Sequence, residues 1–188
     1  SLTEKLQGAE NAEWIEELAR AVSILHSLEL PKLRQRPPED EVESVAALIT
    51  RIKDSDSATI IRRRLEALSS SLPDPVVETL LHRDLYDQQI LFPPKGGVFL
   101  LDLDDIARGD PMLDAGNLFA HIYLLNCLKN IPANHAVIEE TFLHHYTACR
   151  KDTALNDYTS FSWYRNIALT RLAALQTLRG NGLIAGQL

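Results

Sequence analysis

The sequence predicts a mainly helical domain with one small β-hairpin, an α+β fold. Two observations indicate it: apolar residues recur at intervals of three and four in long segments near both ends of the chain, whereas the middle holds short apolar runs around a Pro-Pro-Lys-Gly-Gly turn. The length of 188 residues, with 45% hydrophobic and 24% charged residues, is typical of a globular domain and excludes disordered, collagen-like and disulfide-rich proteins. We expect a single domain over residues 1–188, with parts at 1–75, 76–114 and 115–188.

The first part, residues 1–75, is expected to be essentially helical. From residue 11 to residue 28 apolar side chains share one face and glutamates occupy the others, which predicts an amphipathic helix. A proline-bearing linker at 33–38 precedes a second helix. The Ser-Asp-Ser sequence at 55–57 is expected to cap a third helix, which ends in the Ser-rich turn at 69–75.

The middle part differs in character. Apolar runs at 76–81, 90–92 and 98–103 are predicted to be short strands, and the Pro-Gly turn at 93–97 separates the last two. We expect a small β-hairpin here, with aspartates at the ends of its strands.

Helical periodicity then returns. The segment 113–128 is apolar on most faces and is expected to be deeply buried, 136–148 is amphipathic, and 161–178 is a long helix with an aromatic-rich start. These helices are expected to form a hydrophobic foundation. Cys127 and Cys149 are too few for a disulfide framework or a metal site, and we expect both to be reduced.

The net charge of −7 is unevenly distributed. The seven acidic residues between positions 82 and 114 are all aspartates: Asp84, Asp87, Asp102, Asp104, Asp105, Asp110 and Asp114. Short carboxylates on loops suit hard divalent cations, whereas nucleic acid as a partner would need clustered Lys and Arg. Because no run approaches the roughly 18 apolar residues of a membrane span and no signal sequence opens the chain, we expect a cytoplasmic protein with no membrane partner.

Three side chains of the middle part have the chemistry that phosphoryl transfer requires. That reaction needs a carboxylate to orient the acceptor hydroxyl and accept its proton, and a metal ion held by a carboxylate and an amide oxygen. Asp84 is predicted for the first role, and Gln89 and Asp102 for the second. Strand pairing is expected to bring Asp84 and Asp102 to one edge of the hairpin. The plain alternative is a solvated acidic turn.

These residues lie in three linked motifs: His82-Arg-Asp84 with Gln89 five residues later, Leu-Asp102-Leu, and Gly109-Asp-Pro-x2-Asp114. Their order and spacing resemble the catalytic and metal-binding loops of the aminoglycoside phosphotransferase and choline kinase family, relatives of the protein kinases. The helix that ends in Leu-His26 is similar to the one that precedes the catalytic loop in that family. The resemblance extends roughly over residues 14–178.

The resemblance implies a helical C-terminal lobe of the protein kinase-like fold and assigns roles to single residues. Asp84 would be the catalytic base, and Asp102 and Gln89 would hold Mg²⁺, with Asp104 as a possible additional ligand. His82 and Asp114 would support the loop. The implied cofactors are ATP and Mg²⁺, and the implied partner is a small molecule that accepts phosphate on a hydroxyl.

Two positions depart from the family pattern. Gln89 stands where the family usually has Asn, which offers the same amide oxygen on a shorter side chain. Arg83 is the residue type that protein kinases have at this position, whereas small-molecule kinases more often have Gly. However, the seven residues 103–109 are too few for the activation loop of a protein kinase, so a small-molecule acceptor is favoured.

A larger departure concerns the β-rich N-terminal lobe, which grips the nucleotide with a phosphate loop and a strand lysine. Residues 9–95 contain no Gly, and Lys5, Lys32 and Lys53 are not on predicted strands. We therefore expect that this lobe is absent here and belongs to a full-length chain, and that the isolated fragment is inactive. The alternative function is a catalytically weak or inactive kinase-like binding module.

Overall fold

The computed structural model describes residues 1–7, 13–74, 78–131, 134–150 and 159–188. The helices in these ranges are α1 (Leu2–Gln7), α2 (Glu13–His26), α3 (Pro38–Ile49), α4 (Ser55–Ser69), the short 3₁₀ helix η1 (Asp87–Gln89), α5 (Met112–Lys129), α6 (His135–Cys149), α7 (Thr159–Leu178) and α8 (Gly182–Gln187). The strands are β1 (Thr79–Leu81), β2 (Ile90–Leu91), β3 (Phe99–Leu100) and β4 (Ala107–Gly109). The predicted α+β class is confirmed.

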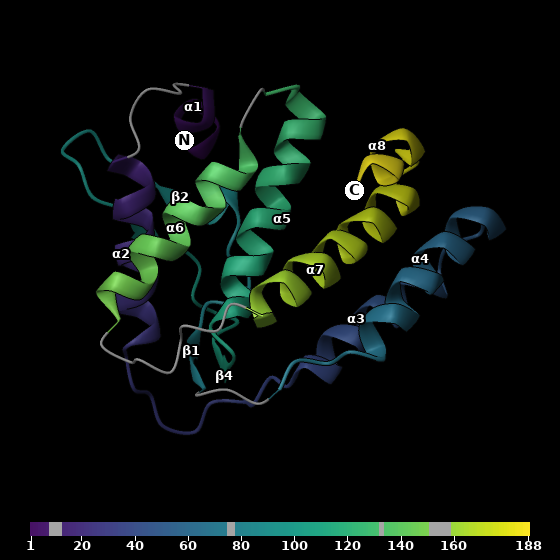
Figure 1. Ribbon diagram of the computed structural model, residues 1–188, viewed down its shortest axis with the longest axis horizontal. Helices are drawn as coiled ribbons and strands as arrows, with labels where there is room; N and C mark the ends of the chain where they lie inside the picture. Colours follow the sequence, from purple (N-terminus) through teal and green to yellow (C-terminus); the bar gives the residue numbers. More distant parts are fainter. Residues whose placement is uncertain (8–12, 75–77, 132–133, 151–158) are drawn as a thin grey trace.

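Two long helices, α5 and α7, lie side by side at the centre of the molecule (Figure 1). On one side α2 and α6 pack together, and on the other α3 and α4 pack against α7 and against each other. The short strands β1 and β4 lie near one end of α5, and α8 folds back onto α7. The helices that the periodicity predicted are all present, although residue 11, where the first was expected to begin, lies outside the described residues.

The strands pair differently from the prediction. The expected hairpin exists between β2 and β3, with Ile90 opposite Leu100. The first apolar run does not join it, because β1 pairs antiparallel with β4, with Leu80 opposite Arg108. Strand β4 was not predicted, since Ala-Arg-Gly has neither alternation nor β-branched residues. Val76 and Val77, the first part of the predicted strand, lie outside the described residues.

Local sequence explains where α4 begins and where α5 ends. Asp54 is the N-cap of α4, because its carboxylate accepts hydrogen bonds from the backbone N–H groups of Asp56 and Ser57. The cap therefore lies one residue before the Ser-Asp-Ser sequence that was expected to supply it. Helix α5 ends at Asn130, whose φ of 50° is left-handed and stops the helix.

The hydrophobic core is centred on α5, as its apolar sequence predicted. Most residues of its first three turns are buried. The largest fully buried side chains of the domain include Phe119, Phe142, Tyr146 and Tyr164, which come from α5, α6 and α7. Phe119 meets Phe142 and Phe161 edge to face, with ring centroids 5.3 and 5.8 Å apart.

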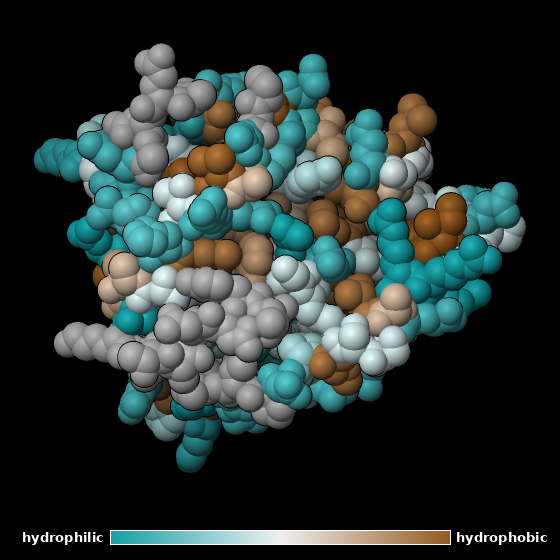
Figure 2. Space-filling view, viewed as in Figure 1, coloured by the Kyte–Doolittle hydropathy of each residue, from teal (hydrophilic) through white to brown (hydrophobic). Residues whose placement is uncertain are grey.

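The surface is mixed in character. On the face shown in Figure 2, hydrophobic residues form small separate patches among hydrophilic ones. None of the helices that the structure describes combines the length and the apolar composition that a membrane crossing requires.

Gly116 allows the close approach of α5 to α7. A Cβ added at this position would lie 2.6 Å from the carbonyl carbon of Tyr164 and 2.6 Å from the backbone nitrogen of Arg165. Since both neighbours are backbone atoms, neither can move without shifting α7.

We predict that Gly116→Ala lowers the free energy of unfolding by about 1–3 kcal/mol, because the added methyl group overpacks this seam. Gly186→Ala in α8 is the matched control, since a Cβ there meets nothing within 4 Å beyond its chain neighbours and its own helix backbone. Urea unfolding of both variants measures the effect. Equal stability of the two variants would contradict the close approach.

Candidate active site

The predicted catalytic residue lies in the loop of residues 82–89, between β1 and β2, and Asp114 anchors the start of this loop. The Asp114 side chain is fully buried in the first turn of α5. Its Oδ2 accepts a hydrogen bond from the backbone N–H of His82 at 2.6 Å, and its Oδ1 accepts one from that of Arg83 at 2.8 Å. These are the contacts that a supporting residue would make.

A second layer of buried groups holds Asp114. His26, at the end of α2, places Nε2 3.0 Å from Oδ2 of Asp114 and Nδ1 2.7 Å from the hydroxyl of Tyr146 on α6. Burial raises the pKa of the Tyr146 hydroxyl well above its ordinary value, so Tyr146 is neutral. The loop is thereby connected to α2, α5 and α6.

The loop has further anchors. Nε2 of His82 lies 2.8 Å from the carbonyl oxygen of Leu101 and donates to it, since a carbonyl only accepts. Asn117 on α5 donates to the carbonyl oxygen of Leu85 at 3.0 Å, and Arg171 on α7 donates to the amide oxygen of Asn117. The side chain of Arg83 pairs with Glu41 on α3 at 3.0 Å.

Asp84 lies between these anchored residues and is partly buried. Among the described residues no side chain or backbone group forms a hydrogen bond with its carboxylate, although residues 82, 83 and 85 are all held. The carboxylate is therefore free to contact a ligand from a fixed position.

The hairpin brings Gln89 and Asp102 together. The backbone N–H of Leu101 donates to the carbonyl oxygen of Gln89 at 2.9 Å, and Nε2 of Gln89 lies 3.2 Å from Oδ2 of Asp102. Asp102 is exposed and has a φ of 60°, a left-handed conformation that is uncommon for a residue other than Gly. Such backbone strain is often found at functional sites.

This donor set fits Mg²⁺, which proteins usually hold with one or two carboxylates together with substrate phosphates and water. Asp102 offers the carboxylate, and a half-turn of the Gln89 amide would direct its oxygen to the same cation. Within the described ranges no three His, Cys, Asp or Glu side chains converge as a complete metal site. Asp104 lies in an exposed turn after β3, and its role as an additional ligand stays a prediction.

Two residues near the loop have shifted pKa values: Asp87 in η1 and His121 in α5. Burial raises the pKa of the Asp87 carboxyl. Burial and, secondarily, the positive charges of Arg171 and Arg179 lower the pKa of His121 to about 4. The His121 ring lies 5.1 Å from that of Tyr86, between centroids. His121 is thus neutral at pH 7.

Several anchoring residues were missed by sequence reasoning. Asn117 had a signal, since it lies three residues after Asp114 and shares its helix face. Glu41, Tyr146 and Arg171 had none, because they reach the loop from helices distant in the sequence.

Comparison with known proteins places this geometry in a family. The model of the phosphotransferase enzyme family matches residues 1–127, which include all the motifs above. The chain belongs to this family. The resemblance to aminoglycoside phosphotransferases and choline kinase is thereby confirmed. Among curated protein sequences, none matches the chain at a significant level.

Solved structures of several phosphotransferases share the fold. A choline kinase from Streptococcus pneumoniae is 19% identical, with a TM-score of 0.59 over 94% of this chain and 61% of its own. A type VIII aminoglycoside-3'-phosphotransferase is 19% identical, with a TM-score of 0.61 over 83% and 59%. An amicoumacin kinase in complex with AMP-PNP and Ca²⁺ is 16% identical, with a TM-score of 0.64 over 89% and 52%.

The chain therefore spans 52% to 61% of the length of these phosphotransferases. Its described residues correspond to the helical, C-terminal-lobe-like part of the fold, as the motifs predicted. At these identities the likeness establishes the fold, and the activity of this member of the family is a separate question.

The lowered pKa of His121 predicts a pH dependence of stability. The unfolded chain binds a proton at this residue near pH 6.5, whereas the folded chain binds it near pH 4. The stability that neutral His121 contributes is therefore present above pH 6.5 and is lost as the pH falls towards 4. The loss is at most about 3 kcal/mol, since one pKa unit corresponds to roughly 1.4 kcal/mol.

Urea unfolding of the wild type and of His121→Gln at pH 7 and pH 4.5 measures this contribution. We expect the wild type to lose more stability than the variant between pH 7 and pH 4.5. Only the wild type has a buried imidazole that binds a proton more readily in the unfolded chain than in the folded one. Identical losses of stability would contradict the lowered pKa of His121. An NMR titration of the ring that gave an ordinary histidine pKa would contradict it as well.

Proposed function

We propose that this chain carries the catalytic half of an ATP- and Mg²⁺-dependent kinase that phosphorylates a hydroxyl of a small molecule. The observation that supports this function best is the carboxylate of Asp84, which accepts no hydrogen bond from the described residues and is held between anchored neighbours, in the loop that leads to Gln89 and the hairpin. Phosphoryl transfer depends on positioning more than on covalent chemistry, so a fixed loop with a free carboxylate suits it.

In this proposal Asp84 orients the acceptor hydroxyl and takes its proton. The acceptor oxygen forms a bond to the γ-phosphorus as the bond from that phosphorus to the bridging oxygen of the nucleotide breaks. Asp102 and the amide oxygen of Gln89 would hold Mg²⁺, which when bound neutralises charge on the phosphates. The amicoumacin kinase with bound AMP-PNP and Ca²⁺ supports a nucleotide and a divalent cation as ligands of this fold.

The hairpin offers exposed apolar side chains for the nucleotide base. Leu91 and Phe99 lie opposite each other on β2 and β3, and Leu101 and Leu103 flank Asp102 in the sequence; each of the four is 42% to 58% exposed. We propose that the planar base packs on these side chains, which brings its phosphates towards Asp102.

The acceptor is proposed to be a small molecule rather than a peptide. The residues after Asp102 turn at once into β4, which pairs with β1. This leaves no room for a long peptide-docking segment between Asp102 and Asp110.

The proposal concerns a longer chain than the one described. In the relatives, 39% to 48% of the length has no counterpart here. Lys5 lies in α1, Lys32 in a turn and Lys53 between α3 and α4, so none of them is a strand lysine. We propose that the missing phosphate contacts come from an additional lobe, and that the isolated 188 residues have negligible turnover.

A kinase-like binding module is the second candidate function. The observation that favours it is Gln89 itself, whose longer side chain stands where the family usually has Asn. If this side chain does not place its amide oxygen on the cation, the cation loses a ligand and catalysis would be weak.

We predict that Asp84→Asn lowers kcat about 10²–10⁴-fold in a longer chain that includes the additional lobe, because the amide cannot accept the hydroxyl proton. ATP consumption with choline, aminoglycosides and amicoumacin as acceptors is the measurement. Asp105→Asn, which removes an exposed aspartate of the following turn, is the control and should keep wild-type activity. Full turnover in Asp84→Asn would exclude Asp84 as the base.

We further predict that Asp102→Asn abolishes the Mg²⁺ dependence of nucleotide binding, since it removes the charged ligand. Gln89→Asn should retain this dependence, because it keeps the amide oxygen on a shorter side chain. Calorimetric titration of a non-hydrolysable ATP analogue with and without Mg²⁺ distinguishes the candidates. Magnesium-dependent binding without turnover favours the binding module, and the absence of magnesium-dependent nucleotide binding contradicts the kinase.

A further inference from the structure

Arg83, the residue before Asp84, has a backbone conformation that requires support. Its φ is 77°, in the left-handed region that Gly adopts without cost and a long side chain does not. The family pattern more often has Gly at this position. Contacts elsewhere in the chain must therefore stabilise Arg83 in this conformation. The same contacts then fix the direction in which the side chain of the next residue, Asp84, points.

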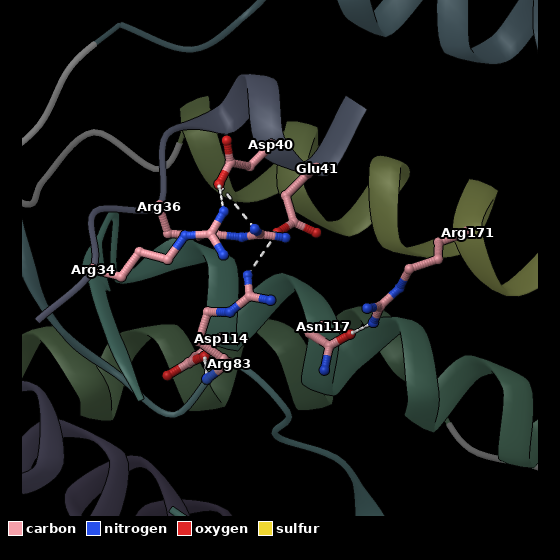
Figure 3. A network of polar contacts seen from close by, with 8 residues as sticks. All are labelled: Arg34, Arg36, Asp40, Glu41, Arg83, Asp114, Asn117 and Arg171. Carbon is pink, nitrogen blue, oxygen red and sulfur yellow. Dashed lines mark hydrogen bonds and ion pairs between the residues drawn. The ribbon is translucent and has the colours of Figure 1, made fainter. Parts of the chain in front are cut away.

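Glu41 supplies that support from α3. It is only 7% exposed, and its Oε1 accepts hydrogen bonds from the Arg83 guanidinium at 3.0 Å and from Nε of Arg36 at 3.1 Å. Figure 3 shows the carboxylate facing both guanidinium groups, with the backbone of Arg83 on Asp114. The loop is thus gripped by its main chain from α5 and by its side chain from α3.

Arg36 connects Glu41 to strand β4. Its backbone N–H donates to the carbonyl oxygen of Arg108 at 2.8 Å, and the N–H of Arg108 donates to that of Arg34 at 2.9 Å. The guanidinium of Arg36 also bonds Asp40, the neighbour of Glu41, at 2.8 Å. Glu41 therefore joins α3, the linker before it and the loop in one rigid contact.

The charges make Glu41 hard to replace. Arg34, Arg36 and Arg83 share the carboxylates of Asp40 and Glu41. Burial lowers the pKa of the Arg83 guanidinium, Glu41 opposes this effect, and the charge of Arg36 adds to it. Without the Glu41 charge, two partly buried guanidinium groups would repel each other, and Arg83 would lose the partner that balances its burial.

We propose that Glu41 is a positioning residue, which clamps Arg83 and thereby couples the α3–α4 pair of helices to the orientation of Asp84. The effect on catalysis rests on the proposed function, whereas the clamp itself does not.

The test is amide hydrogen exchange of the 188-residue chain, read by NMR at the backbone N–H of residues 82 and 83. We expect at least tenfold faster exchange at both amides in Glu41→Gln, with the core amides of α5 and α7 unchanged. Glu39→Gln is the matched control, since Glu39 is an exposed residue of the same helix, and it should change exchange less than twofold.

A double-mutant cycle identifies the partner. In Arg83→Gly the left-handed conformation costs nothing and the clamp is gone, so adding Glu41→Gln should have no further effect on the two amides. The proposal is wrong if Glu41→Gln equals Glu39→Gln, if its effect persists in the Arg83→Gly background, or if protection is lost equally throughout α5 and α7.

The catalytic consequence has its own readout. In the longer chain, Glu41→Gln should lower kcat and leave KM for ATP unchanged, because the nucleotide is expected on the hairpin and the hydroxyl at Asp84. If the wild-type longer chain has no turnover, the proposed function fails, but the exchange results still decide whether the clamp exists. An equal change of kcat and KM would contradict a role confined to Asp84.

Discussion

The buried carboxylate of Asp114 is the group on which the candidate active site depends. A carboxylate with no exposed surface is costly to bury unless its oxygens receive hydrogen bonds. Here they receive two backbone N–H groups of the loop and the ring of His26. Its place in the first turn of α5 adds the favourable field of the helix N-terminus. The requirement to satisfy this one charge brings α2, α5 and the loop together.

The remaining packing keeps Asp114 in place. Gly116, two residues later, lets α7 approach α5 closely, and Asn117, one residue further, connects Arg171 of α7 to the loop. One turn of α5 thus provides a buried anion, a close helix contact and a loop anchor. The two sheets are too small to be stable by themselves, and they depend on this helical base.

The hydrogen bonds and ion pairs of the loop hold its backbone and leave one carboxylate free. Residues 82, 83 and 85 are held by α5, α3 and the hairpin, whereas the carboxylate of Asp84 has no bonding partner among the described residues. The strained conformations of Arg83 and Asp102 are placed on either side of this carboxylate in the sequence. The left-handed conformations of Arg83 and Asp102 are tolerated because hydrogen bonds hold the backbone at or next to each residue. This combination of fixed surroundings and a free group suits the proposed role of Asp84 in phosphoryl transfer.

The sequence by itself determined helices α2 to α7, the hairpin and the order of the candidate residues, but not the short helices α1, η1 and α8. These follow from short-range patterns: apolar periodicity, the Pro-Gly turn, and motifs in which Asp84, Gln89 and Asp102 are separated by a few residues or one hairpin. Only the tertiary structure decided that β1 pairs with β4, that His26 and Tyr146 stand behind Asp114, and that Glu41 holds Arg83. Such contacts join residues that are far apart in the sequence. They depend on the path of the whole backbone, on which local pattern carries no information.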